Sequence, residues 1–383
     1  MKIILCNNNL AGLYLFRRDI VRHFAESGHE ILLLFPYTDA TKDDGYEDFL
    51  SRYARCIPVP MQPNSQSIFE DYRLYRILRR IYRREHPDIV FNFTVKPNIY
   101  SALAACRMGI RVVDMMPGLG YVFIGDSLKK RVMRRLYRWG LHAADWVIVL
   151  NQHSYDTVVD RYVDRNKLIL FPGGEGVNME EYPYRVNSFG TTTFLMIARL
   201  LYDKGVKEFI DAAACVHQTH PDVRFELLGE LSEDSPTGVP RASLEAAVRE
   251  GHVAYLGTTD DVPSIVLRDG IVVVIPSYYM EGMNRALMEA CAMGRPIITT
   301  DMPGCKEMVN DGQTGYCIPP RSAQALADAC LRFLGLSESE KQAMSRASYE
   351  KCRSQFNVRL VIEAYERIIS ELTSDHEDRP HRV

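Results

Sequence analysis

The sequence lacks several features that would place it in particular protein classes. Its nine cysteines form an odd, scattered set without a C-x-x-C pair, which argues against a disulfide framework or a zinc site. No apolar run approaches the roughly 18 residues of a membrane-spanning helix, and the first apolar run is too short for a signal peptide. No D-x-D triplet suggests a bound metal ion. We therefore expect a cytoplasmic protein that uses neither a metal nor another cofactor.

The net charge is small but unevenly divided. The 383 residues carry a net charge of −3, and this length favours two domains of about 180 residues each. Residues 1–190 hold 26 Lys and Arg against 21 Asp and Glu, whereas the remainder holds 20 against 28. The first half is therefore the one suited to anionic partners, and we expect no nucleic acid among them.

Apolar runs typical of strands alternate with helical patterns along both halves. Strands are expected at residues 2–7, 29–35, 89–93 and 112–115, and the pattern restarts at 193–197. Such alternation predicts parallel sheets covered by helices on both faces, with ligands at the carboxyl ends of the strands. No G-x-G-x-x-G follows the first strand, so the dinucleotide fingerprint is absent. The expected parts are an N-terminal domain (1–185), a C-terminal domain (186–355) and a last helix with a polar tail (356–383).

Two carboxylates mark residues 271–300, a stretch typical of a buried strand, a turn, a helix and a second strand. If the helix begins near Asn284, Glu281 stands just before it and Glu289 lies roughly 12 Å further along, at ~1.5 Å per residue. An elongated ligand could lie along that edge and be held at both ends. The helix start would also offer partial positive charge to an anionic group. The free backbone N–H groups expected there are those of Met283, Asn284 and Arg285.

A purely structural interpretation of the same residues stays open. Arg285 and Glu289 have opposite charges at an i,i+4 spacing, which is the spacing of an ordinary surface salt bridge on a helix. Glu281 could likewise do no more than favour the helix N-terminus. The spacing alone therefore does not separate ligand binding from helix stabilisation.

Two cations follow the first strand of the second half. Arg199 stands at the end of that strand and Lys204 at the start of the next helix, so both could converge on a diphosphate. Arginine supplies a rigid fork of donors, lysine a point charge, and the helix N-terminus its dipole. The alternative treats Asp203 as a helix N-cap and Lys204-Gly205 as a turn.

Two loops of the first half also follow strands. Residues 93–98 place Lys96 directly after a buried strand, and residues 116–121 form a turn that contains Gly118 and Gly120. Lys96 could face a ligand or be a solvated loop lysine. The glycines could serve a binding site or only reverse the chain.

Residues 128–140 have the pattern of a basic amphipathic helix. Near an anionic membrane each cation of such a helix could contribute ~1 kcal/mol, whereas the alternative is a solvated face on a helix that packs on the sheet. The helix expected at residues 72–84 repeats the pattern more weakly. In the first helix the apolar residues are Leu128, Val132, Met133, Leu136, Tyr137 and Trp139, and the bases are Lys129, Lys130, Arg131, Arg134, Arg135 and Arg138.

The stretch PSYYMEGMNRALMEACAMGRPIITTDMPGCKEMV resembles the E-x7-E signature of the retaining glycosyltransferases of family 4 and the downstream run G-x-P-[VI]-[IV]-x-[ST]-D-x-x-G-x-x-E-x-[VI]. After the glycine of the signature the family usually has an apolar residue and then Pro, where this chain has Met283 and Asn284. Two further loops, T-x-K-P-N-x-Y and G-L-G-x-x-[FY], resemble the acceptor side of a bacterial subgroup that acts on polyprenyl-diphosphate-linked saccharides. The resemblance covers nearly the whole chain and is strongest over residues 196–309.

This resemblance implies the GT-B fold, in which two Rossmann-like α/β domains with parallel sheets face each other across a cleft and the last helix crosses back to the first domain. The acceptor would bind to the first domain and the nucleotide-sugar to the second. The implied reaction is retaining transfer of a hexose or N-acetylhexosamine from a UDP-sugar to a lipid-diphosphate-linked saccharide. It would take place at the inner face of the cytoplasmic membrane, where the basic helix could contact anionic lipid.

The resemblance also implies roles for individual residues. Arg199 and Lys204 would stabilise the negative charge that develops on UDP. Glu281 would hold the hydroxyls of the transferred sugar and Glu289 the ribose diol. The other donor-side positions are Gly12, Gly257, Asp260, Val262, Gly282, Met283, Asn284 and Arg285. The acceptor-side positions are Lys96, Asn98, Gly118, Gly120 and Tyr121.

With both glutamates engaged by the donor, the resemblance implies front-face transfer, in which the donor phosphate accepts the proton of the acceptor. A covalent route like that of retaining glycosidases is the alternative mechanism. Two other functions stay open. Non-hydrolysing UDP-N-acetylglucosamine 2-epimerases share the two-domain fold and the nucleotide but need no acceptor, and a nucleotide-sugar-binding regulator would show no turnover.

Overall fold

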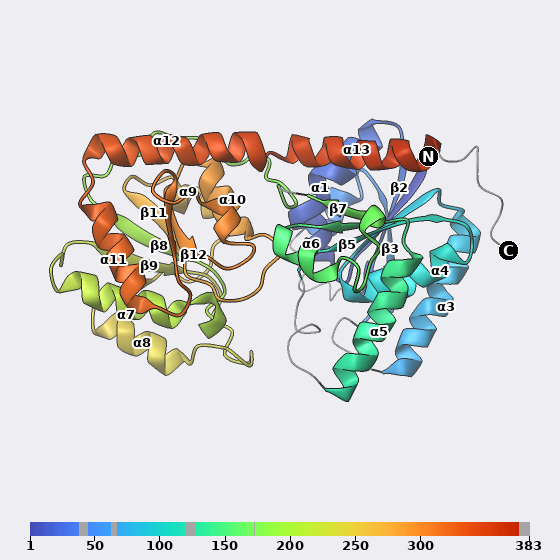
Figure 1. Ribbon diagram of the computed structural model, residues 1–383, viewed down its shortest axis with the longest axis horizontal. Helices are drawn as coiled ribbons and strands as arrows, with labels where there is room; N and C mark the ends of the chain where they lie inside the picture. The colour runs from blue at the N-terminus through green and yellow to red at the C-terminus, as the bar shows by residue number, and fades with distance from the viewer. Residues whose placement is uncertain (38–44, 63–66, 119–126, 172, 375–383) are drawn as a thin grey trace. The chain divides into compact units, whose positions relative to one another are not determined.

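The computed structural model describes residues 1–37, 45–62, 67–118, 127–171 and 173–374. They divide into two compact units (Figure 1). Unit 1 contains Met1–Gly176 and the stretch that begins at Val358, and unit 2 contains Val177–Asn357.

Residues 177–185, which the sequence assigns to the first domain, belong to unit 2 in the structure. Val177 lies in the core of unit 2, and Met179 and Tyr182 pack against that core. The chain therefore joins the second unit through apolar contacts well before the first strand of that unit.

Unit 1 is built on a seven-stranded sheet with the order β3-β2-β1-β4-β5-β6-β7, in which neighbouring strands are parallel. Its central strands are buried and largely apolar, as strands covered on both faces must be. Because the strands run the same way, their carboxyl ends share one edge. The strands are β1 (Lys2–Cys6), β2 (Glu30–Pro36), β3 (Arg55–Val59), β4 (Ile89–Phe93), β5 (Arg111–Met116), β6 (Trp146–Val149) and β7 (Leu168–Leu170).

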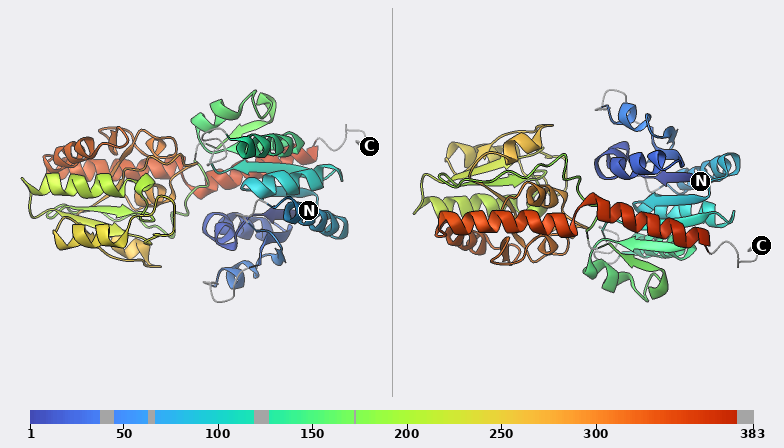
Figure 2. Two further views of the ribbon diagram at one scale, coloured as in Figure 1. Left: turned by 90° about the horizontal axis from the view of Figure 1, so that it is seen from below. Right: turned by 90° about the horizontal axis from the view of Figure 1, so that it is seen from above.

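In unit 1, helices α3 and α5 belong to one layer, because both pack against α4 and the π-helical turn η2. On another side, α13 packs against α1 (Figure 2), and Tyr365 of α13 contacts the rings of Phe24 and Phe91. The C-terminal helix is therefore part of the unit 1 core. The elements are α1 (Leu10–Glu26), α2 (Tyr46–Leu50), α3 (Ile68–Glu85), η2 (Pro97–Ser101), α4 (Ala102–Cys106), α5 (Leu128–Ala143), α6 (Gln152–Val158), η3 (Arg165–Lys167) and α13 (Val358–Ser374).

Helix α5 departs in one respect from the amphipathic pattern expected of residues 128–140. Tyr137 is buried, as predicted. Val132 and Trp139, which the sequence assigns to the apolar face, are instead exposed. Part of the apolar face of α5 therefore does not pack against unit 1. Among the residues described, no helix is long and apolar enough to cross a membrane.

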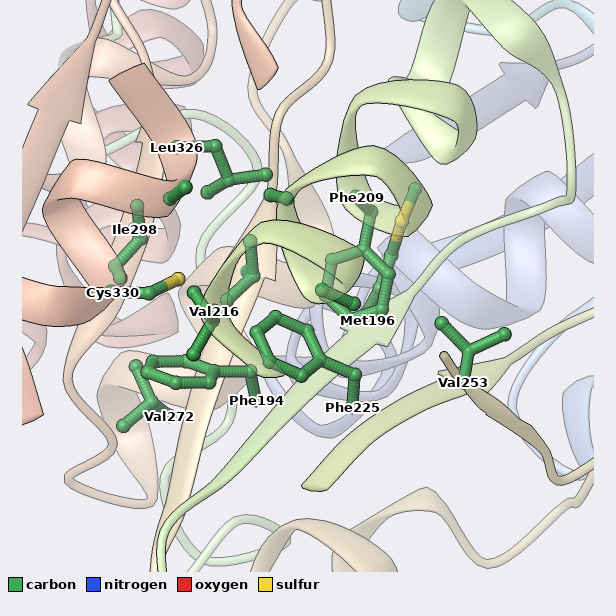
Figure 3. Packing of buried hydrophobic residues seen from close by; sticks show 14 of the residues in the cluster. Phe194, Met196, Phe209, Val216, Phe225, Val253, Val272, Ile298, Leu326 and Cys330 are labelled. Atoms are coloured by element: carbon green, nitrogen blue, oxygen red, sulfur yellow. The ribbon is translucent and has the colours of Figure 1, made fainter. Parts of the chain in front are cut away.

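Unit 2 repeats the architecture with a six-stranded parallel sheet in the order β10-β9-β8-β11-β12-β13. The alternation seen in the sequence therefore gives two Rossmann-like units. On one face of this sheet the rings of Phe194 and Phe225 lie 5.0 Å apart, and Phe209 of helix α7 (Val206–His217) packs on Phe225 at 5.4 Å (Figure 3). The strands are β8 (Thr193–Ile197), β9 (Arg224–Leu228), β10 (Ala254–Tyr255), β11 (Ile271–Ile275), β12 (Ile297–Thr300) and β13 (Gly315–Ile318).

The helices and short helical turns of unit 2 connect these strands. Those at the carboxyl edge of the sheet carry the candidate site. The helices and helical turns of unit 2 are η4 (Tyr202–Lys204), α7 (Val206–His217), α8 (Arg241–Arg249), α9 (Val262–Val266), α10 (Arg285–Ala292), η5 (Lys306–Met308), α11 (Ala323–Leu334) and α12 (Glu338–Gln355).

Candidate active site

Four loops gather at the carboxyl edge of the unit 2 sheet. They follow β8, β9, β10 and β11, which are parallel neighbours in the sheet. Three of the residues predicted to bind the donor lie on these loops: Arg199, Gly257 and Glu281. The topology of the sheet therefore places them along a single edge.

Lys204 is brought to this edge by the glycine that follows it. Gly205 has a φ of +85°, and a Cβ on it would lie 2.2 Å from the carbonyl oxygen of Pro276. Only glycine lets the start of α7 pass so close to the end of β11. In addition, the carbonyl of Asp203 accepts the backbone N–H of Tyr278 at 2.9 Å. These contacts hold Lys204 beside the loop that follows β11.

Lys204 and Glu281 form an ion pair, with 2.6 Å between Nζ and Oε1, and both side chains are largely buried. The carboxylate of Glu281 also accepts hydrogen bonds from Oγ of Ser277 at 3.2 Å and from Nδ2 of Asn284 at 3.1 Å. The ammonium group of Lys204 lies 5.3 Å from the ring centroid of Tyr279, within the range of a cation–π contact. The cation expected at the diphosphate is therefore held against the carboxylate expected at the sugar.

Helix α10 begins where the sequence predicts, because Asn284 caps it. Its Oδ1 accepts the backbone N–H of Leu287 at 3.1 Å. The prediction of a free N–H on Asn284 is wrong, since that group donates to the carbonyl of Gly304 at 2.8 Å. A Cβ on Gly304 would lie 2.7 Å from the carbonyl oxygen of Glu281. The glycine of the downstream run therefore allows its segment to close on the Glu281 loop.

Glu289 accepts two hydrogen bonds on the same oxygen, Oε1. One comes from Nε of Arg285 at 2.8 Å and the other from the hydroxyl of Tyr182 at 2.8 Å. The i,i+4 salt bridge is therefore present, but both of its side chains are largely buried. Burial and then the neighbouring carboxylate raise the pKa of Tyr182 to about 12, so its hydroxyl keeps its proton and donates it.

Arg199 lies just beyond β8 with an exposed side chain. Its guanidinium forms neither a hydrogen bond nor an ion pair within the described ranges. Helix α7 begins after Gly205 without a side-chain cap, so the alternative that made Asp203 its N-cap is wrong. Arg199 is thus the more accessible cation of this edge, and Lys204 the more buried one.

The loop that contains the predicted donor-side residues Gly257, Asp260 and Val262 is held at both ends. The carbonyl of Gly257 accepts the backbone N–H of Gly229 at 2.8 Å. At the other end Val262 begins α9, and Asp261 caps this helix by accepting the N–H of Ser264 at 3.2 Å. Between these points lies Asp260, which is exposed.

On unit 1, Lys96 is nearly buried and its Nζ lies 2.8 Å from Oδ1 of Asp71. The hydroxyl of Tyr100 donates to the other oxygen of that carboxylate at 2.7 Å. The alternative of a solvated loop lysine is therefore wrong. A role for Lys96 toward an acceptor stays a prediction, and it would require the lysine to act from within this group.

Asn98 is fully buried and connects three parts of unit 1. Its Nδ2 donates to the carbonyl of Met115 at 2.8 Å and to the hydroxyl of Tyr137 at 3.1 Å. These bonds join η2 to the end of β5 and to α5, just before the turn that contains Gly118. The two other acceptor-side positions on this turn, Gly120 and Tyr121, lie outside the described residues.

Gly12 lies in the first turn of α1, after the carboxyl end of β1. A Cβ on it would meet Nδ2 of Asn7 at 2.3 Å, and its backbone N–H donates to the side chain of the N-cap Asn9. Close packing at the start of α1 therefore requires the glycine, and its donor role stays a prediction.

Sequence reasoning missed Tyr182, which reaches Glu289 across 107 positions of the chain. It also missed the buried ion pair between Arg17 and Glu175, in which the guanidinium lies 3.9 Å from the ring centroid of Phe93. Neither contact has a local signal, because each joins segments that are far apart in the sequence. A charged residue within an apolar helical stripe, as Arg17 is in α1, is the one hint that a buried partner exists.

Comparisons with known proteins show which proteins the chain is similar to. Residues 191–335 match the family model described as glycosyl transferases group 1, and residues 17–174 match the one described as glycosyltransferase family 4. The N,N'-diacetylbacillosaminyl-diphospho-undecaprenol alpha-1,3-N-acetylgalactosaminyltransferase of Campylobacter jejuni is 26% identical to the chain and covers 91% of it, with 92% of that protein covered. The UDP-Gal:alpha-D-GlcNAc-diphosphoundecaprenol alpha-1,3-galactosyltransferase of Escherichia coli is 25% identical, with 81% of this chain and 82% of that one covered.

Solved structures share the fold at low sequence identity. The glycosyltransferase of Rickettsia africae superposes with a TM-score of 0.77 and 18% identity, covering 97% of this chain and 98% of its own. Anabaena HepE in complex with UDP gives 0.76 and 18%, covering 97% and 100%. The predicted GT-B fold is therefore confirmed.

Proposed function

This chain belongs to the glycosyltransferases of family 4 and has their GT-B fold, and we propose that it transfers a hexose or N-acetylhexosamine from a UDP-sugar, with retention of configuration, to a polyprenyl-diphosphate-linked saccharide. The observation that carries the donor part is the Lys204–Glu281 pair at the carboxyl edge of the unit 2 sheet. Two relatives that are named as transferases acting on undecaprenyl-diphosphate-linked sugars support the acceptor part.

In the proposed mechanism the main problem is charge. As the glycosidic bond breaks, the sugar ring becomes cationic and UDP gains negative charge, so preorganised cations at the leaving group lower the barrier most. Lys204 and Arg199 supply these cations. Lys204 is already largely buried and is held by Glu281 and the ring of Tyr279, and Ser277 in turn donates to Glu281, so little reorganisation is needed when the diphosphate arrives.

The two glutamates would hold the two ends of the donor. Glu281 stands beside Lys204 and would accept hydrogen bonds from hydroxyls of the transferred sugar. Glu289 lies on the second turn of α10, bound to Arg285 and Tyr182, and would accept the ribose diol. With both carboxylates engaged, front-face transfer, in which the donor phosphate takes the proton of the acceptor hydroxyl, is the mechanism that fits.

A lipid-linked acceptor would bring the enzyme to the inner face of the cytoplasmic membrane. The bases of α5 support peripheral association there, since the helix carries six Lys and Arg and no Asp or Glu. Each cation near an anionic leaflet contributes about 1 kcal/mol. The membrane is thus a proposed partner of unit 1, as the UDP-sugar is of unit 2.

A donor panel tests the proposal. Purified protein is incubated with UDP-hexoses and UDP-N-acetylhexosamines in the presence of a bacterial lipid extract, and the lipids are read by mass spectrometry. We expect one UDP-sugar to extend a polyprenyl-diphosphate-linked saccharide by one sugar residue. Retention is checked by NMR of the new anomeric centre.

Matched reactions without lipid extract are the control for the panel. Conversion of a UDP-N-acetylhexosamine to its epimer in these reactions would contradict the proposed transfer. Inversion at the anomeric centre would contradict its stereochemistry while leaving the acceptor assignment in place.

A further inference from the structure

The first turn of α3 exposes large apolar side chains. Ile68, Phe69 and Tyr72 are 83%, 88% and 61% exposed. Side chains of this size forgo a substantial stabilisation when they are left in water, and a cluster of them marks a surface that meets an apolar partner. The feature is separate from the bases of α5, and the sequence pattern did not single it out.

Helix α5, which lies in the same helix layer as α3, exposes a second pair of apolar side chains. Val132 and Trp139 are 53% and 51% exposed, and the guanidinium of Arg135 lies 5.6 Å from the ring centroid of Trp139. Helices α3 and α5 both pack against α4 and η2. Each follows the carboxyl end of a strand of the same parallel sheet, so their N-terminal ends project on one side of unit 1 (Figure 1).

Cations accompany both apolar groups. An anionic bilayer combines an apolar interior with negatively charged headgroups and therefore complements this combination of side chains. The absence of acidic residues from α5 extends the same complementarity along that helix. The exposed arginines are Arg73, Arg76, Arg80, Arg83 and Arg84 on α3, and Arg131, Arg135 and Arg138 on α5.

We propose that α3 and α5 together form a docking surface for an anionic lipid bilayer. Ile68, Phe69 and Tyr72 insert below the headgroups, and the exposed arginines of both helices contact the lipid phosphates. The inference deepens the proposed function, on which it rests for the reason a membrane would be met.

Vesicle co-sedimentation tests the surface. The wild type is expected to bind vesicles of phosphatidylcholine with phosphatidylglycerol more strongly than phosphatidylcholine alone. The double variant Ile68→Ser/Phe69→Ser should lose about tenfold or more in binding at every salt concentration, because apolar insertion is not screened. Arg135→Glu/Arg138→Glu should lose binding mainly at low salt. Val186→Ser, which removes a 63% exposed apolar residue from unit 2, is the matched control.

Turnover of a short soluble acceptor separates this inference from the proposed function, because all three variants should keep it. Equal vesicle binding by wild type and Ile68→Ser/Phe69→Ser would overturn the docking surface. So would a wild-type dimer, seen by light scattering without vesicles, that the same variant dissociates, since the apolar group would then be a contact between two copies of the chain.

A separate observation concerns Tyr182 and also rests on the proposed function. Tyr182 and Arg285 both donate to Oε1 of Glu289, and within the described ranges no residue donates to Oε2. Two donors on one oxygen fix the rotation of the carboxylate. We infer that Tyr182 is a positioning residue, which turns Oε2 toward the ribose hydroxyls of the donor.

Tyr182→Phe tests the role because it removes only the hydroxyl. We expect the Kd for UDP to rise about three- to tenfold, the effect of one hydrogen bond, with kcat nearly unchanged. Tyr184→Phe, which changes a tyrosine two positions away whose ring packs against that of Tyr349, is the control. In a Glu289→Gln background, Tyr182→Phe should have no further effect on UDP binding.

The outcomes distinguish the role of Glu289 from that of Tyr182. If Glu289→Gln leaves UDP binding intact, the ribose assignment of the proposed function is wrong. If Glu289→Gln weakens UDP binding but Tyr182→Phe leaves it unchanged, or acts additively with it, the positioning role alone is overturned.

Discussion

Lys204→Ala is expected to lower kcat by roughly 10²–10³, the usual loss when one preorganised electrostatic donor is removed. In the absence of donor the lysine neutralises Glu281 at 2.6 Å. During transfer the diphosphate gains negative charge, so the lysine stabilises the transition state more than the bound substrate, and kcat falls more than KM rises. Arg199→Ala should cause a loss of the same order, since its exposed guanidinium is free to follow the departing UDP.

Steady-state kinetics with the UDP-sugar that the donor panel identifies measures this effect, and thermal unfolding verifies that the fold is intact. Lys207→Ala is the matched control, because Lys207 lies on the adjacent helix and forms an exposed ion pair with Asp211. Such pairs contribute little to stability. Turnover close to the wild type in both Lys204→Ala and Arg199→Ala would show that the leaving group is stabilised by other residues.

The strands that the sequence predicts well are those buried on both faces. β4 and β8 have the bounds expected from their apolar runs, residues 89–93 and 193–197. β3 has no such run, because it lies at an edge of its sheet and contains Arg55 and Pro58. An edge strand needs no apolar residues on its outer side and tolerates proline, so pattern alone does not reveal it.

In the candidate site, features within one short segment were predicted from the sequence, whereas contacts between distant segments were not. The start of α10 and the place of Glu281 before it follow from spacing within one short segment, and both were predicted. The pairing of Lys204 with Glu281 depends on β8 and β11 being neighbours in the sheet, which the sequence does not state. The contact of Tyr182 with Glu289 likewise depends on residues 177–185 packing on unit 2.

Buried polar side chains were the least predictable part of unit 1. Lys96 follows a strand and precedes a Pro-Asn turn, a context typical of an exposed loop. The structure instead gives it Asp71 as a partner from the first turn of α3. Charge pairing over such distances leaves no trace in local composition, whereas the cost of burying an unpaired charge makes the partner necessary once the lysine is buried.

Glu289→Gln and Glu281→Gln are expected to fail in different ways, because the two residues hold opposite ends of the donor. A carboxylate accepts two hydrogen bonds from a ribose diol, so Glu289→Gln should weaken the binding of UDP by about 1.5–3 kcal/mol, the range for hydrogen bonds to a charged group. Asn284 and Arg285 would remain in place, so the helix start itself is kept.

Glu281→Gln should spare UDP affinity or increase it, since the change removes the carboxylate that neutralises Lys204 and leaves the full lysine charge to the diphosphate. Transfer should nevertheless fall strongly, because the sugar loses its charged acceptor. Calorimetry with UDP and turnover assays on both variants measure the two effects. Loss of UDP binding in Glu281→Gln together with its retention in Glu289→Gln would mean that the donor lies along α10 in the opposite direction, with its ribose at Glu281.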